Sequence, residues 1–78
     1  MMTFEKAKHI HFIGIGGIGM SALARLAMHD GKKVSGSDRT PSSITKALLQ
    51  EGANIFNDHS SDNVSKDVDL VIYSEAVD

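Results

Sequence analysis

The architecture of the chain depends most on residues 8–24, which read KHIHFIGIGGIGMSALA. Lys8–Ile13 is nearly continuously apolar from its middle onward, which is typical of a parallel strand covered on both faces. Gly14–Gly19 contains four glycines and predicts a tight loop. Ile18–His29 follows as a predicted amphipathic helix, because apolar residues recur there at steps of three and four. The predicted buried stripe of this helix consists of Ala22, Leu23, Leu26 and Ala27.

The alternation of strand and helix continues downstream. Gly31 fits a left-handed cap after the first helix, and Lys33–Gly36 is a short second strand. Thr40-Pro41 predicts the start of a second helix, because a hydroxyl cap followed by proline is a common beginning. Gly52 is expected to end that helix. Its predicted buried side chains are Ile44, Ala47 and Leu48.

Two more strands complete the predicted sheet. Asn54–Phe56 is short, Val68–Tyr73 is largely apolar, and the polar segment 57–67 between them is expected to hold at most a brief helix. Strands that alternate with helices pair in parallel. We therefore predict a single small α/β domain with a Rossmann-like parallel sheet, in the strand order 3-2-1-4, flanked by helices.

The composition limits what the chain can do alone. Its 78 residues suffice for one small domain, residues 1–78, but not for a complete multidomain enzyme. A formal net charge of −2 argues against binding to nucleic acid or to a membrane surface. The absence of cysteine excludes disulfides, thiolate metal sites and thiol catalysis. We find neither an export signal nor the about 20 apolar residues that cross a bilayer, so we expect a cytoplasmic protein.

The glycine loop carries the main functional signal. Gly14, Gly16 and Gly19 match the pattern G-x-G-x-x-G between a predicted strand and a predicted helix. In this setting we expect Gly14 to allow the sharp turn, Gly16 to let a diphosphate approach the backbone, and Gly19 to let the helix pack against the strand. The helix N-terminus offers unpaired N–H groups to an anion, and the Ser21 hydroxyl could add a donor. The loop has no lysine, which distinguishes it from an ATP P-loop.

Polar residues follow the other predicted strands. Asp38 lies 19 residues after Gly19, where a carboxylate can accept hydrogen bonds from ribose hydroxyls. Arg39 could contact a base or a phosphate, His59 a base, and Ser74 a phosphate or sugar. For each of these residues the alternative is a solvent-exposed loop position.

We expect neither a metal site nor catalysis from this chain. His9 and His11 lie on one face of the first strand. No third ligand accompanies them, so packing or hydrogen bonding is the expected role of this pair. Elsewhere the sequence shows no nucleophile with a base partner, no close carboxylate pair and no metal-ligand cluster.

The string His11–Ala24 resembles the opening of the Mur ligases, the amide ligases of bacterial cell-wall (peptidoglycan) synthesis. Within that family it is most similar to the branch that joins L-alanine to UDP-N-acetylmuramate. Three later pieces fit the same branch: Val34–Asp38, Gly52–Phe56 with His59, and Asp69–Val77. A generic dinucleotide dehydrogenase would share the glycines but not the string through Met20-Ser21. Asp78 departs from the family, which often has proline shortly after this strand.

The resemblance implies an ATP-dependent ligase of three domains. The N-terminal domain holds the UDP part of UDP-N-acetylmuramate, the central domain binds ATP and Mg²⁺, and the C-terminal domain helps to bind the amino acid. This chain matches only the N-terminal domain, so the remaining domains are its implied partners and the chain alone should bind without catalysing. The implied UDP-sugar-binding residues are Gly16, Gly17, Ile18, Gly19, Met20, Ser21, Ser37, Asp38, Arg39, His59, Ser74, Glu75 and Ala76.

Two other functions compete with this hypothesis. The first is an NAD(H)-binding module of a dehydrogenase or of a ligand-gated regulator, since Asp38 could hold the ribose of either ligand. The second is a structural or interaction domain whose glycine loop binds nothing. The paralogous ligase that recycles murein tripeptide shares the architecture, but its glycine loop usually reads differently.

Overall fold

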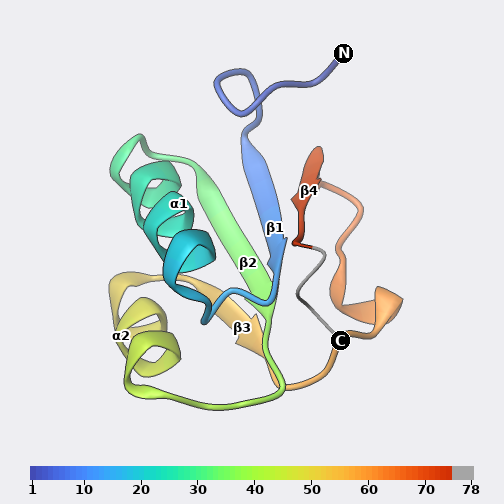
Figure 1. The fold of residues 1–78 in the computed structure, drawn as a ribbon. Coiled ribbons are helices and arrows are strands. Elements are labelled where there is room, and N and C mark those ends of the chain that lie inside the picture. The colour runs from blue at the N-terminus through green and yellow to red at the C-terminus, as the bar shows by residue number, and fades with distance from the viewer. Residues whose placement is uncertain (75–78) are drawn as a thin grey trace.

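The computed structural model describes residues 1–74. Its elements are β1 (His9–Ile13), α1 (Ile18–His29), β2 (Lys33–Ser37), α2 (Ser43–Glu51), β3 (Asn54–Phe56), the short 3-10 helix η1 (Ser61–Asn63) and β4 (Leu70–Ile72). The four strands form one parallel sheet in the order β3-β2-β1-β4, which confirms the predicted topology (Figure 1). No helix in this part of the chain is long and apolar enough to cross a membrane.

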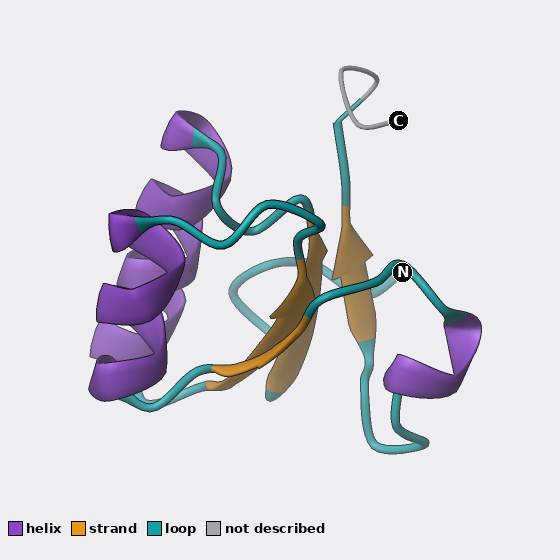
Figure 2. Cartoon of the chain, turned by 90° about the horizontal axis from the view of Figure 1, so that it is seen from below, coloured by secondary structure: helices purple, strands orange, loops and turns teal. Residues whose placement is uncertain are grey.

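Both α-helices lie on one face of the sheet (Figure 2). The opposite face is crossed by the connection from β3 to β4, which contains η1. Fully buried side chains fill the core from both helices and from β1: Ile10, Phe12, Ala24, Ala27 and Leu48. Because β1 leads through the glycine loop directly into α1, the N-terminus of α1 lies at the carboxyl edge of the sheet.

Helix α1 has the predicted bounds but a different buried face. Its buried residues are Ser21, Ala24 and Ala27. Ala22 is exposed, and Leu23 and Leu26 are 39% and 50% exposed, so the predicted stripe is wrong for these three residues and correct for Ala27. Small side chains on the inner face allow the helix to approach the sheet closely, which leaves the bulkier leucines on its outer side.

Helix α2 begins two residues later than predicted. Ser42 is the N-cap, because its hydroxyl accepts the Thr45 N–H at 3.2 Å and the Thr45 hydroxyl accepts the Ser42 N–H at 2.9 Å. The predicted cap, Thr40, instead donates its N–H to the Asp38 carboxylate. Gly52 ends the helix in a left-handed conformation, with a φ of 116°, as predicted.

Three strands differ in length from the prediction, and β1 begins one residue later than expected, at His9. β2 extends one residue further, to Ser37, whose carbonyl accepts the first two N–H groups of the glycine loop. β4 is shorter than predicted and begins after Asp69. The carboxylate of Asp69 accepts the N–H groups of Lys8 and His9 at 2.9 and 3.1 Å, so this residue ties the start of β1 through its side chain.

The sheet face opposite the helices carries a polar cluster. His9 and His11 share this face as predicted, and both contact the buried Ser35 hydroxyl, at 2.9 and 2.8 Å. Burial, with smaller contributions from His9 and His59, lowers the pKa of His11. His9 and His11 therefore serve hydrogen bonding within the sheet. Among residues 1–74, no group of three or more His, Cys, Asp or Glu is placed to hold a metal ion.

Candidate functional site

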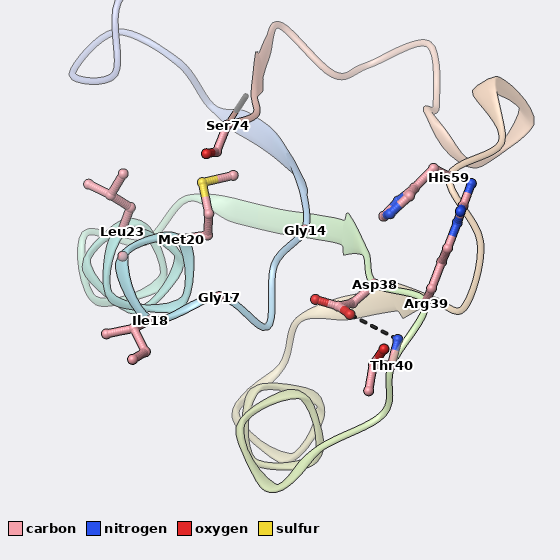
Figure 3. Close-up of a pocket in the computed structure, with 11 residues that line it drawn as sticks. Gly14, Gly17, Ile18, Met20, Leu23, Asp38, Arg39, Thr40, His59 and Ser74 are labelled. Carbon is pink, nitrogen blue, oxygen red and sulfur yellow. Dashed lines mark hydrogen bonds between the residues drawn. The ribbon is translucent and has the colours of Figure 1, made fainter. Parts of the chain in front are cut away.

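A pocket of about 700 Å³ opens at the carboxyl edge of the sheet, beside the glycine loop (Figure 3). This is the edge at which open parallel sheets bind their ligands. The residues that line it come from the glycine loop, the start of α1 and the segments after the other strands: Gly14, Gly17, Ile18, Gly19, Met20, Leu23, Asp38, Arg39, Thr40, His59 and Ser74.

Most residues singled out by the sequence meet at this pocket. Those that line it are Gly17, Ile18, Gly19, Met20, Asp38, Arg39, His59 and Ser74. The structure places Gly16, Ser21 and Ser37 behind the pocket lining. Glu75 and Ala76 lie outside the described residues.

The predicted binding residues omit three lining residues: Gly14, which was expected only to form the turn, Leu23 and Thr40. Leu23 was assigned to the buried stripe of α1, and Thr40 to the cap of α2. The available signal for Thr40 was its position two residues after Asp38, whose carboxylate accepts its N–H at 2.9 Å. The signal for Leu23 was its place one helical turn after Gly19, on the same side of α1.

The first turn of α1 directs its backbone donors at the pocket. The Gly17 N–H donates to the Gly14 carbonyl at 3.0 Å, and the Ser21 N–H makes the first bond into the helix, to the Gly17 carbonyl at 2.8 Å. The intervening N–H groups, of residues 18–20, have no acceptor within residues 1–74, and no side chain caps this end. These donors and the positive end of the helix dipole favour an anion here.

Ser21 contributes to the helix rather than to the pocket. Its side chain is 5% exposed, and its hydroxyl donates to the Ile18 carbonyl at 3.0 Å. The hydroxyl is thus used within the helix, and its donation to an anion stays a prediction.

Gly16 has a different role from the one predicted. Its N–H donates to the Asp38 carboxylate at 2.8 Å. A Cβ atom added at Gly16 would lie 2.7 Å from Asp38 Oδ2 and 2.9 Å from Thr45 Cγ2. The space beside Gly16 is thus filled by the protein, and its lack of a side chain allows β2 and α2 to pack against the loop.

Gly19 borders open space rather than other parts of the protein. A Cβ atom added at Gly19 would meet nothing within 4 Å, so this glycine does not serve close packing of the helix against the strand. Gly19 lines the pocket instead. Its missing side chain leaves the first turn of α1 open to a ligand. Gly14 does form the predicted sharp turn, with a φ of 82°.

Asp38 joins the two backbone segments that border the pocket. One carboxylate oxygen accepts the Gly16 N–H at 2.8 Å, and the other accepts the Thr40 N–H at 2.9 Å. Each oxygen keeps a lone pair for a further donor, such as a ribose hydroxyl. Asp38 therefore shapes the glycine loop in addition to lining the pocket.

His59 lines the pocket and also contacts Ser37. The Ser37 side chain is 1% exposed, so it does not face a ligand directly as the resemblance implied. Its hydroxyl lies 2.6 Å from His59 Nδ1. The Ser37 hydroxyl thus contacts His59, which lines the pocket.

The pocket has one apolar wall and one polar wall. Ile18, Met20 and Leu23 extend from α1 on one side, and Asp38, Arg39 and His59 lie on the other side (Figure 3). Ile18 is 86% exposed, an unusual position for a large aliphatic side chain unless it contacts a ligand or another surface. The arrangement suits a ligand with an anionic centre, a polar ring and an uncharged portion.

A family model described as "Mur ligase family, catalytic domain" matches residues 9–78. The chain belongs to the Mur ligase family. It is 53% identical over 73 residues to the UDP-N-acetylmuramate–L-alanine ligase of Clostridium novyi, and 53% identical over 74 residues to that of Desulforapulum autotrophicum. These alignments cover 94% and 95% of this chain and 16% of each relative.

A solved structure of the same family has the same fold. The crystal structure of the UDP-N-acetylmuramate–alanine ligase from Thermotoga maritima matches 92% of this chain and 16% of its own, with a TM-score of 0.83 and 46% identity. The chain therefore spans 16% of the length of the relatives compared. The NAD(H)-binding alternative finds no support among these proteins.

Proposed function

We propose that residues 1–78 form the N-terminal UDP-binding domain of a ligase that joins L-alanine to UDP-N-acetylmuramate in peptidoglycan synthesis. The observation that carries this proposal is the open first turn of α1, where three N–H groups with no acceptor among residues 1–74 border a pocket. The similarity to ligases named for this substrate supplies the identity of the anion.

The two walls of the pocket suggest how UDP would lie. The diphosphate accepts hydrogen bonds from the N–H groups of Ile18, Gly19 and Met20. The ribose lies against Asp38, whose carboxylate oxygens have room for hydroxyl donors. The uracil ring lies toward His59 and Arg39 on the polar wall.

The remaining chemistry belongs to the rest of the ligase in this proposal. The glycine loop has no lysine for an ATP phosphate, so ATP and Mg²⁺ bind in the other domains. The full enzyme is cytoplasmic and acts on a nucleotide-linked sugar, with ADP and phosphate as co-products. Ser21 and Ser37 support the UDP site through hydrogen bonds of their hydroxyls, and Gly16 and Gly17 support it through hydrogen bonds of their backbone N–H groups.

Isothermal titration calorimetry with the 78-residue chain tests this proposal. We expect saturable binding of UDP and of UDP-N-acetylmuramate, weaker binding of uridine, and weaker binding of NAD. The difference between UDP and uridine should shrink at high salt, because the diphosphate interaction is electrostatic. Tighter binding of NAD than of UDP would favour the dinucleotide alternative, and no binding of any nucleotide would favour a structural role.

A further inference from the structure

Ser37 makes one side-chain contact whose direction the UDP-binding proposal does not specify. It is the last residue of β2, and its hydroxyl lies 2.6 Å from Nδ1 of His59. The His59 side chain extends from the segment after β3 toward the pocket (Figure 3). Ser37 itself is 1% exposed, so its hydroxyl is shielded from solvent.

The direction of this hydrogen bond follows from the burial of Ser37. A serine hydroxyl has one proton to donate, and a buried donor without an acceptor is costly. Within residues 1–74, His59 Nδ1 is the acceptor that the Ser37 hydroxyl reaches. If Nδ1 carried the ring proton, it would donate to Ser37 and leave the buried hydroxyl proton without a partner.

We propose that Ser37 is a positioning residue that fixes the tautomer of His59. The hydroxyl donates to Nδ1, so the ring proton of neutral His59 resides on Nε2. His59 therefore presents a hydrogen-bond donor to the pocket. It selects a ligand that places an oxygen acceptor opposite the ring, either a base carbonyl or a phosphate oxygen.

Ser35 provides an internal comparison on the same strand. Its hydroxyl contacts two imidazoles, His9 at 2.9 Å and His11 at 2.8 Å, so it can donate to one ring and accept from the other. Ser37 has a single imidazole partner, so its proton has one destination. Ser35 is thus shared by the rings of His9 and His11, whereas Ser37 fixes which nitrogen of His59 carries the proton.

Nitrogen NMR of the imidazole rings tests the tautomer directly in the ligand-free chain. Long-range ¹H–¹⁵N correlations recorded at about pH 8 should show His59 with a bare Nδ1 and a protonated Nε2. Ser37→Ala should shift both nitrogens toward the averaged values of mixed tautomers. Ser37→Thr, which keeps the hydroxyl, should restore the original pattern, and the exposed Ser43→Ala should leave it unchanged.

A proton on Nδ1 in the native chain would overturn the inference. So would an unchanged tautomer in a folded Ser37→Ala variant. The native spectrum needs no substitution, so the test stands even if Ser37→Ala fails to fold.

Ligand binding tests the consequence, and only this part rests on the proposed function. Ser37→Ala should weaken UDP binding by roughly two- to tenfold, the effect of about one neutral hydrogen bond. The same change in a His59→Ala background should have no further effect, because Ser37 acts through the ring. An equal loss for uridine places the acceptor on the nucleoside, and a loss for UDP alone places it on the diphosphate.

The two proposals fail in different ways. A loss for neither ligand, or additive effects of the two substitutions, would contradict the role of Ser37. A native chain that shows the expected tautomer but binds no UDP would leave the role of Ser37 in place and remove the UDP-binding proposal.

Discussion

Gly16 and Gly19 should respond oppositely to the same substitution. Gly16→Ala would place Cβ 2.7 Å from Asp38 Oδ2 and 2.9 Å from Thr45 Cγ2. Gly19→Ala would place Cβ in open space at the pocket. Both glycines belong to the same short loop-to-helix segment, so each variant is the matched control of the other.

The neighbours of Gly16 have little freedom to move. The Asp38 carboxylate is held by the N–H groups of Gly16 and Thr40, and Thr45 is held in the capping box with Ser42. Relief of the clash therefore breaks one of these contacts. Overpacking of this kind costs about 1–3 kcal/mol. The φ of Gly16 is not positive, so the loss comes from contact rather than from backbone strain.

The cost at Gly16 should be visible in thermal unfolding. For a domain of this size, each kcal/mol lowers the Tm by about 4–8 °C. Gly19→Ala should leave the Tm unchanged or raise it, since alanine is favoured over glycine in a helix by up to about 1 kcal/mol. Its effect should fall on UDP affinity, because the new methyl group occupies the approach to the helix N-terminus.

Circular dichroism for the Tm and calorimetry for UDP affinity separate the two outcomes. A Gly16→Ala variant as stable as the native chain would refute the packing role of Gly16. A Gly19→Ala variant with native UDP affinity would refute the placement of the diphosphate over the first turn of α1.

Three further changes test other parts of the structure. Asp38→Ala should lower stability by about 1–3 kcal/mol in urea denaturation, because two backbone N–H groups lose a charged acceptor; native stability would show that Asp38 does not hold the loop. The lowered pKa of His11 means that below about pH 6.5 the unfolded chain takes up a proton that the native chain resists. The free energy of unfolding should therefore fall as the pH is lowered from about 7 to about 5. His11→Asn should reduce this pH dependence, and the exposed control His29→Gln should retain it. Gly36→Ala should prevent stable folding, since its Cβ would lie 2.5 Å from the Phe12 carbonyl oxygen; a soluble variant with native circular dichroism would contradict this.

The sequence predicted the order and pairing of the elements well because those depend on local patterns. Glycine caps at Gly31 and Gly52, a continuous apolar first strand and alternation of strands with helices were sufficient for the sheet order. The buried face of α1 was not predictable in the same way. Both a leucine face and a small-residue face satisfy the helical period, and only tertiary packing selects the second.

Within the site, spacing identified which loops meet but not what each residue does. The glycine pattern does not show which glycine borders a ligand, because that depends on Asp38 and Thr45 from more distant parts of the chain. Likewise, the resemblance to the Mur ligases implied a ligand contact for Ser37. The structure instead gives that hydroxyl to His59, a partner 22 residues away.

Amide NMR during a UDP titration tests the central claim most directly. The ¹H–¹⁵N signals of Ile18, Gly19 and Met20 should move the most, because their N–H groups receive the diphosphate. The signals of Gly31 and Gly52, at the helix caps away from the pocket, should barely move. Saturating UDP that leaves the first three signals in place would contradict the account of this site.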